Sequence, residues 1–247
     1  MRIPILIHAH LPRTGGTALW DAITQALGPH VLRVDEFGPD TPQIVQRELE
    51  ADPTLLAVSS HGIRGWLPDR IAGREVILVT ALREPARQVV SWVTYLRQDY
   101  PRISRATRAQ LGIDGLDGLP LDAFVARLVD SFKEPVRSCR GLWFLPVAHF
   151  GYQNPAYRDD GAAAATIEHL RRFTVGGLAE DLPGLAYRVS ARIDQQIPRP
   201  RVVNCQRNDD EAAAIASDPR LREFLETGIE ADRIVYRWSL GFSSLHG

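Results

Sequence analysis

The stretch "LIHAHLPRTGGTALWDAI", from Leu6 to Ile23, changes character twice in eighteen residues. It opens with a short apolar run that contains β-branched residues, which is typical of a buried parallel strand. A Pro-Arg-Thr-Gly-Gly-Thr turn follows at 12–17. The remainder has the spacing of a helix from about Thr17 to Leu27. The stretch therefore predicts a strand, a tight turn and a helix in immediate succession.

The turn has the composition of an anion site. A strand that runs through such a turn into a helix gathers backbone N–H groups and the positive end of the helix dipole at one point. Gly15 and Gly16 permit a close approach of the backbone. Thr14 and Thr17 add hydroxyl groups, and Arg13 adds a charged fork. On the turn alone, the alternative is a plain strand-to-helix connection in which Thr17 caps the helix.

Further apolar runs and amphipathic segments alternate along the rest of the chain. This alternation predicts an α/β fold, a single domain over 1–247 with a mostly parallel central sheet flanked by helices. The middle, 99–160, is richer in Gly, Pro, Arg and aromatic residues. We expect strands at 2–9, 30–36, 54–62, 74–84, 173–180 and 201–206, and helices at 17–27, 41–52, 85–97, 121–132 and 161–173 and from about 181, 209 and 230.

Composition narrows the class of protein. The chain has 247 residues, is 45% hydrophobic and carries a formal net charge of -1, which gives no argument for nucleic-acid binding. Lys133 is the only lysine among 29 basic residues, so a single Arg is weaker support for a phosphate site than usual. Cys139 and Cys205 form no close-spaced pair, and no secretory segment or membrane-spanning run is recognised. We therefore expect a cytoplasmic protein without a membrane span.

The letters of the turn exclude two common phosphate loops. The chain has no Gly-Lys-Ser/Thr of a nucleoside-triphosphatase loop and no G-x-G-x-x-G of a dinucleotide site. Instead, the segment from His10 to Thr17, His-Leu-Pro-Arg-Thr-Gly-Gly-Thr, resembles the 5′-phosphosulfate loop of the P-loop sulfotransferases. In the carbohydrate sulfotransferase branch this loop reads His-x-Pro-Lys-Thr-Gly-Gly-Thr. Arg13 stands at the position of the family Lys.

A second segment, 80–96, resembles the 3′-phosphate motif of the same family, Arg-x-Pro, two residues, Arg, two residues, Ser. Arg83 ends a predicted strand and Ser91 lies on the following helix, so both are expected at the carboxyl edge of the sheet. Gln88 occupies the second Arg position, and Arg87 stands one residue earlier, about 100° around the helix. Whether Arg87 compensates is open. The alternative is an Arg at a strand end and a Ser on an exposed helix face.

Three segments, 59–67, 173–189 and 230–238, are similar to the family more loosely, and 99–160 has no match and is expected to be an acceptor-binding insertion. The resemblance implies transfer of the sulfuryl group from 3′-phosphoadenosine 5′-phosphosulfate to a hydroxyl or amine of a carbohydrate or small metabolite. It leaves 3′-phosphoadenosine 5′-phosphate as product and requires no metal. The expected nucleotide contacts are Pro12, Arg13, Thr14, Gly15, Gly16, Thr17, Ala18, Arg83 and Ser91.

The catalytic roles implied by the resemblance need a cation and a base. Arg13 would neutralise the leaving oxygen without donating a proton, because a guanidinium stays ionised. His61 ends the third predicted strand and is the expected base, with Glu36 at the end of the second as the alternative. The other interpretation of His61 is a structural histidine that donates to a backbone carbonyl at the strand end. His8 and His10 flank the loop, and we interpret both as structural.

Other interpretations stay open. One is an atypical nucleotide or small-molecule kinase that uses ATP and magnesium, and the other is a non-catalytic nucleotide-binding module. The sequence identifies neither the acceptor nor the oligomeric state. Single aromatic and basic residues could contact adenine or an acidic acceptor, although each is more often part of a core, a rim or a solvated face: Trp66, Trp143, Tyr152, Arg137, Arg140 and Arg158.

Overall fold

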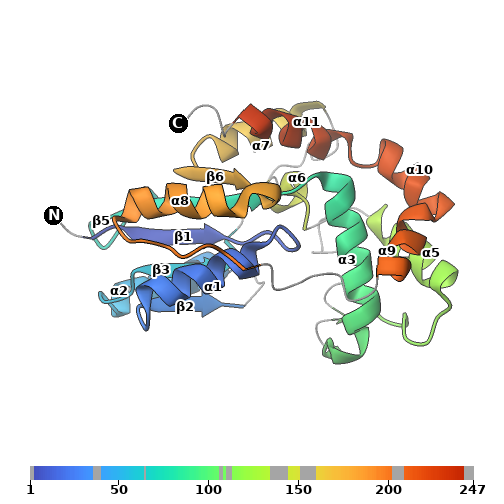
Figure 1. Cartoon of the computed structure of the whole chain (residues 1–247), viewed down its shortest axis with the longest axis horizontal. Coiled ribbons are helices and arrows are strands. Elements are labelled where there is room, and N and C mark those ends of the chain that lie inside the picture. Colours follow the sequence, from blue (N-terminus) through green and yellow to red (C-terminus); the bar gives the residue numbers. More distant parts are fainter. Residues whose placement is uncertain are drawn as a thin grey trace.

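A mostly parallel β-sheet forms the centre of the protein (Figure 1). The structure is a computed structural model that describes residues 3–35, 40–63, 65–105, 108–109, 113–133, 144–150, 160–201 and 209–241. The strands lie in the order β2-β3-β1-β5, and β6 pairs with the carboxyl half of β5. Among the strands of the described residues, only the short β4 is antiparallel, and it pairs with the start of β5. Their bounds are β1 Ile5–Ala9, β2 Val31–Val34, β3 Ala57–Ser60, β4 Arg70–Ile71, β5 Arg74–Leu82 and β6 Val175–Leu178.

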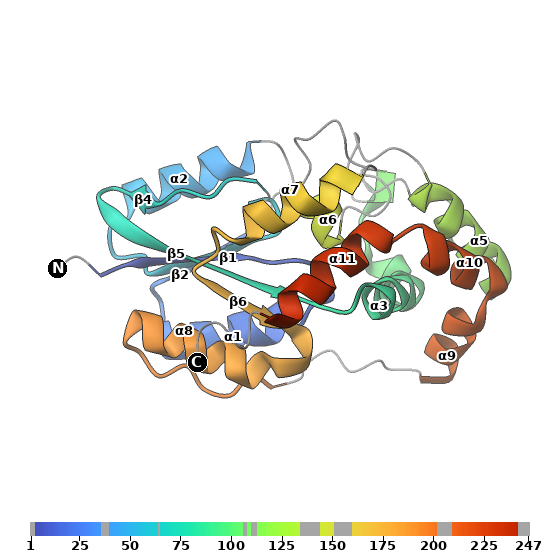
Figure 2. The ribbon, with the colours of Figure 1, turned by 90° about the horizontal axis from the view of Figure 1, so that it is seen from above.

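Helices cover both faces of this sheet, as Figure 2 shows from above. On one face, α2, α7 and α11 pack against Ile5 and Ile7 of β1, and on the other α1 and α8 pack against Leu6. The strand β1 is therefore buried on both faces, as its continuous apolar run predicts. The helix bounds on these faces are α1 Gly16–Leu27, α2 Thr41–Ala51, α7 Asp160–Leu170, α8 Leu182–Ile193 and α11 Glu230–Ser239.

A second apolar core lies beyond the carboxyl edge of the sheet. Helix α3, Pro85–Asp99, leaves the end of β5 and packs with α5, α9 and α10 around Phe124, Phe132 and Phe144. Figure 1 shows this group of helices beside the sheet. The remaining elements are α5 Leu121–Phe132, α6 Pro146–Phe150, α9 Asp209–Ser217, α10 Pro219–Thr227 and the 3₁₀ turns Tyr100–Arg102 and Ala179–Asp181.

The predicted α/β fold with a mostly parallel, helix-flanked sheet is confirmed. One helix was not expected between those at 209 and 230. Helix α10 begins at Pro219, where the Asp218 carboxylate accepts from the N–H groups of Arg220 and Leu221. This is a strong start signal that the sequence already contains. Most of the strand expected at 201–206 lies outside the described residues. Within the described residues, every helix is too short or too polar to cross a membrane.

A buried arginine fixes the amino edge of the sheet. Arg74, the first residue of β5, is 7% exposed and donates from Nη1 to the carbonyls of Pro53 and Leu55, at 3.1 and 2.8 Å. Its Nε donates to the carbonyl of Ile3 at 2.8 Å. The guanidinium thus satisfies carbonyl groups of the segments that lead into β1 and β3, which compensates for its burial.

A buried carboxyl group joins α11 to α6. Asp232 is 5% exposed, and its Oδ1 accepts from the backbone N–H of Val147 at 2.8 Å. Burial raises the pKa of Asp232 to about 7, against the opposing effect of that hydrogen bond. Because α6 begins just after Phe144, this contact also fixes the segment that leads to the second core.

The raised pKa of Asp232 predicts a pH-dependent effect on stability. The carboxyl group of Asp232 holds its proton in the folded protein at pH values where it has lost it in the unfolded chain. Its contribution to the free energy of unfolding is therefore complete below about pH 4 and is lost as the pH rises through about 7. Asp232→Asn keeps an acceptor for Val147 without the charge. We expect the free energy of unfolding of the natural protein, relative to Asp232→Asn, to fall by on the order of 2 kcal/mol between pH 5 and pH 8 in urea titrations. Asp21→Asn, on the exposed side of α1, is the control. A difference that does not change with pH would contradict the prediction.

Candidate functional site

The loop between β1 and α1 lies at the carboxyl edge of the sheet, at its central strand. Helix α1 begins at Gly16, with Gly15 as N-cap in the left-handed region, φ 77°. Thr17 lies inside the helix, so the alternative in which Thr17 caps it is wrong. The Thr14 hydroxyl donates to the Leu11 carbonyl at 2.9 Å. Among the described residues no side chain caps α1, so its first amide groups have no side-chain acceptor, as in helix N-termini that bind anions.

The two glycines of the loop are required by close packing. A Cβ on Gly16 would overlap the ring of His10. That ring cannot move aside easily, because it is buried and stacked between His8 and His61, with ring centroids 5.1 and 4.1 Å away. A Cβ on Gly15 would lie 2.6 Å from Cδ1 of Leu182, at the start of α8. The backbone of the loop can therefore adopt its path only without side chains at these positions.

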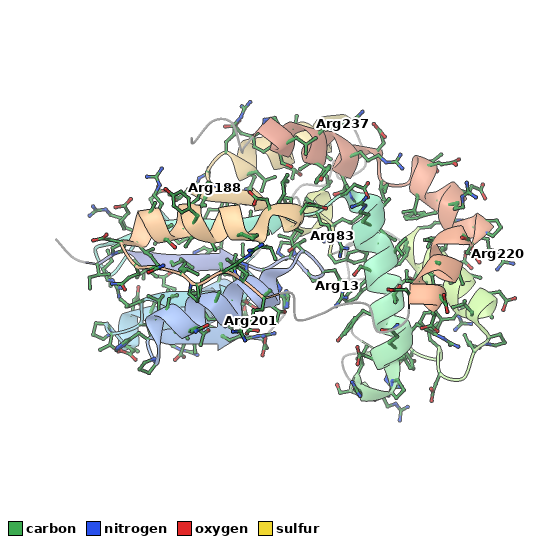
Figure 3. The ribbon with its side chains drawn as sticks, viewed as in Figure 1. Arg13, Arg83, Arg188, Arg201, Arg220 and Arg237 are labelled. Atoms are coloured by element: carbon green, nitrogen blue, oxygen red, sulfur yellow. The ribbon has the colours of Figure 1, made fainter. Side chains whose placement is uncertain are left out.

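Arg13 is the residue at which the two sequence motifs meet. Its backbone is left-handed, φ 65°, an uncommon conformation for a residue other than glycine. Its Nε donates to Oγ of Ser91 at 3.1 Å, and its guanidinium lies over the ring of Tyr95, 5.1 Å from the centroid. Arg83 donates from Nη1 to the Arg13 carbonyl at 3.0 Å. Figure 3 shows Arg13 and Arg83 close together, between the sheet and α3.

Burial lowers the pKa of both arginines of this pair but leaves both charged. Burial lowers the pKa of Arg13, and the neighbouring Arg83 lowers it further. Burial also lowers the pKa of Arg83, against the attraction of Glu180. Both guanidinium groups stay ionised at neutral pH, because an unperturbed Arg titrates above about pH 12. The loop is therefore flanked by two permanent positive charges.

Gln88, at the second Arg position of the resembled motif, has a different role from that of a phosphate ligand. It is fully buried, and its Nε2 donates to the carbonyls of Pro12 and Phe144, both at 2.8 Å. The side chain thus ties the loop to the segment before α6. Arg87 is exposed on the first turn of α3, and its contribution to a 3′-phosphate site stays a prediction. Ser91 is 2% exposed, so the alternative that placed it on an exposed helix face is wrong.

The histidines form a stack beneath the loop. His61 is partly exposed, and its Nδ1 donates to the His10 carbonyl at 2.5 Å, which fixes the tautomer with the proton on Nδ1. Burial lowers the pKa of His61 to about 4, against the opposing effect of this bond. Burial and the neighbouring His61 lower the pKa of His8 to about 3, and Nδ1 of His8 bonds Oγ of Ser59 at 2.9 Å. His8 and His10 are buried and neutral, as a structural role requires.

Several predicted residues cannot be placed. Glu36, Trp143, Tyr152, Arg137, Arg140 and Arg158 lie outside the described residues. Trp66 is partly buried and packs against the core beneath α2 and α7. In the described ranges, no group of three or more His, Cys, Asp or Glu side chains is arranged to hold a metal ion.

Two side chains that support the loop or the strand end before it are not among the residues expected from the sequence. Tyr95 lies four residues after Ser91, on the same face of α3, and this spacing was an available signal. Thr80 of β5 donates its hydroxyl to the Ala9 carbonyl at 2.9 Å and so supports the end of β1. A threonine inside an apolar strand gives no comparable signal.

The chain was compared with models of known protein families and with curated proteins, and neither comparison gives a match. The interpretation of this site therefore depends on its own residues and geometry.

The packing around Gly16 gives a test of the loop. Gly16→Ala should lower the free energy of unfolding by about 1 to 3 kcal/mol, because the new methyl group must displace a stacked, buried ring. Gly161→Ala, in α7 with open space around the added Cβ, is the matched control and should leave stability unchanged or raise it by up to about 1 kcal/mol. Urea unfolding of both variants measures the difference. Equal stability of Gly16→Ala and the natural protein would mean that Gly16 is not packed closely against the ring of His10.

Proposed function

We propose that the protein is a sulfotransferase that moves the sulfuryl group of 3′-phosphoadenosine 5′-phosphosulfate to a hydroxyl or amine of an acceptor, a carbohydrate or small metabolite. One observation carries the proposal. The residues of two motifs far apart in the sequence, Arg13 with Ser91 and Arg83 with Arg13, are in direct contact at one helix N-terminus. A helix N-terminus flanked by two cations suits a ligand that carries several negative charges.

In this proposal, the start of α1 binds one phosphate group of the nucleotide, and Arg83 and Ser91 bind the other. The amide groups of Gly16, Thr17 and Ala18 at the start of α1 bind the 5′-phosphate. Arg83 binds the 3′-phosphate. Ser91 accepts from Arg13 through one lone pair and keeps its hydroxyl proton, so it can donate to the same phosphate without releasing Arg13. The residues present therefore fit a nucleotide with phosphate groups at both positions.

Arg13 and His61 carry the chemistry. The bond between sulfur and the oxygen of the 5′-phosphate breaks as a bond forms between sulfur and the acceptor oxygen or nitrogen. Arg13 stabilises the charge that develops on the leaving phosphate oxygen. His61 takes the proton of the acceptor at Nε2, since Nδ1 already carries a proton toward the His10 carbonyl. A bound anion raises the pKa of His61 from its low value and so makes it a stronger base.

The competing functions differ in the ligand they require. A kinase would bind ATP with magnesium, and a non-catalytic module would bind the nucleotide without turnover. The Gly-Lys-Ser/Thr of common nucleoside-triphosphate loops is missing from the chain, which favours the sulfotransferase over the kinase. A cytoplasmic location is part of the same proposal.

Isothermal titration with 3′-phosphoadenosine 5′-phosphate and with adenosine 5′-phosphate, without magnesium, tests the nucleotide site. We expect micromolar binding of the former and weaker binding of the latter. Arg83→Ala should weaken the former by about 10- to 100-fold, the value of one charge-assisted hydrogen bond, and the latter much less. Arg87→Ala, run beside it, measures whether the exposed neighbour contributes. Equal losses for both nucleotides in Arg83→Ala would contradict its role, and a response only to ATP with magnesium would favour the kinase.

Substitution of His61 tests the base. His61→Ala should lower turnover by about 10² to 10⁴, with nucleotide affinity nearly unchanged, because a base acts on the acceptor proton. His30→Ala, exposed before β2, is the matched control and should turn over normally. Rates are measured with an acceptor found by screening sugars and small hydroxyl compounds. Unchanged turnover in His61→Ala would transfer the role to Glu36.

A further inference from the structure

Three side chains of α3 act on Arg13 from one face of the helix. Ser91, Tyr95 and Asp99 follow one another at intervals of four residues, so they lie in a row. Ser91 accepts from Nε of Arg13, and the Tyr95 ring lies under the guanidinium. The Asp99 carboxylate attracts the same charge and is bonded at Oδ1 by Arg102 at 2.9 Å. The cation of the loop is thus held by the helix that carries the second motif.

This row suits an arginine and would not suit a lysine. A guanidinium is planar and can present Nε to an acceptor while its face lies on an aromatic ring. A lysine has one nitrogen at the end of a flexible chain, which cannot lie flat on a ring and donate sideways in the same way. The aromatic ring at position 95 therefore suits an arginine at position 13 better than a lysine.

We propose that Tyr95 is a positioning residue for Arg13, whose ring fixes the guanidinium plane so that an arginine takes the role that sulfotransferase loops assign to lysine. The catalytic role of position 13 rests on the proposed function. The contact between Tyr95 and Arg13 does not depend on it. In free solution an arginine side chain samples many rotamers, and burial against a ring removes most of that freedom. A fixed cation stabilises charge on a leaving oxygen without having to reorganise during the reaction.

The surroundings of the phenol agree with this role. Tyr95 is half-buried on α3, next to Trp92, with ring centroids 5.6 Å apart. Burial raises the pKa of the Tyr95 hydroxyl and Asp99 raises it further, whereas Arg13 lowers it. The ring therefore faces Arg13 as a neutral phenol at physiological pH, with the negative face of its quadrupole available to the cation.

A double-mutant cycle tests the inference through activity. Tyr95→Leu should lower kcat by about threefold to thirtyfold, the range expected for one cation–π contact, and change KM for the nucleotide much less. Tyr95→Phe keeps the ring and should retain the natural kcat. In the background of Arg13→Lys, Tyr95→Leu should have little further effect, because the ring has lost its planar partner. Tyr187→Leu, a tyrosine 76% exposed on α8, is the matched control.

A second measurement needs no catalysis. The absorbance titration of the Tyr95 phenol, taken as the difference between the natural protein and Tyr95→Phe, should move to higher pH in Arg13→Ala, because the cation that favours the phenolate is removed. No movement would overturn the inference whatever the activity. Equal losses of kcat for Tyr95→Leu in the natural protein and in the Arg13→Lys variant, or a Tyr95→Phe as impaired as Tyr95→Leu, would also overturn it. A titration that moves in a protein that transfers no sulfuryl group would support the contact and reject the proposed function alone.

Discussion

The site depends on the way Arg13 is held at both of its ends. Its carbonyl accepts from Arg83 at 3.0 Å, and its side chain donates to Ser91 at 3.1 Å. The first bond ties the loop to the end of β5 and the second ties it to α3. Because the residue has a left-handed backbone, which an arginine adopts only at a cost, these contacts must compensate locally. Loss of either would leave the cation free to turn away from the amino end of α1, where the anion is expected.

Buried hydrogen bonds connect the loop with distant helices. Gln88 bonds the carbonyls of Pro12 and Phe144, and Phe144 precedes α6, whose second residue is bonded by Asp232 of α11. A segment near the carboxyl end of the chain is thus connected to the loop through side chains that solvent hardly reaches. Breaking a buried pair leaves an unsatisfied group, which costs more than the pair contributes when intact. We infer that the position of the loop is determined by the packing of α3, α6 and α11 together, beyond its own glycines.

The sequence predicted most of the fold and part of the site, and the division has a physical reason. The strand β1, the turn and α1 depend on local apolar spacing and on glycines, so they could be read directly. From the sequence, Gln88 is only a neutral residue at an Arg position of the motif. Its structural role could not be predicted, because its partners Pro12 and Phe144 lie 76 and 56 positions away. Ser91 was expected at the site from the resemblance alone, since which face of α3 meets the loop depends on tertiary packing. Tyr95 shares that face, but an aromatic residue on a helix is usually part of a core and so gives no specific signal of a site.

The charges at the loop separate into groups that respond to pH and groups that do not. Arg13 and Arg83 stay ionised throughout the physiological range, so attraction of an anion does not depend on pH there. The histidine stack is neutral in the folded protein, and burial lowers the pKa of His8 and His61 to about 3 and 4. These residues stabilise the fold above the pKa of an unfolded histidine, about 6.5, and that stabilisation is lost as the pH falls toward their folded values. Acid should therefore weaken the packing of the histidines under the loop at pH values where Arg13 and Arg83 keep their charges.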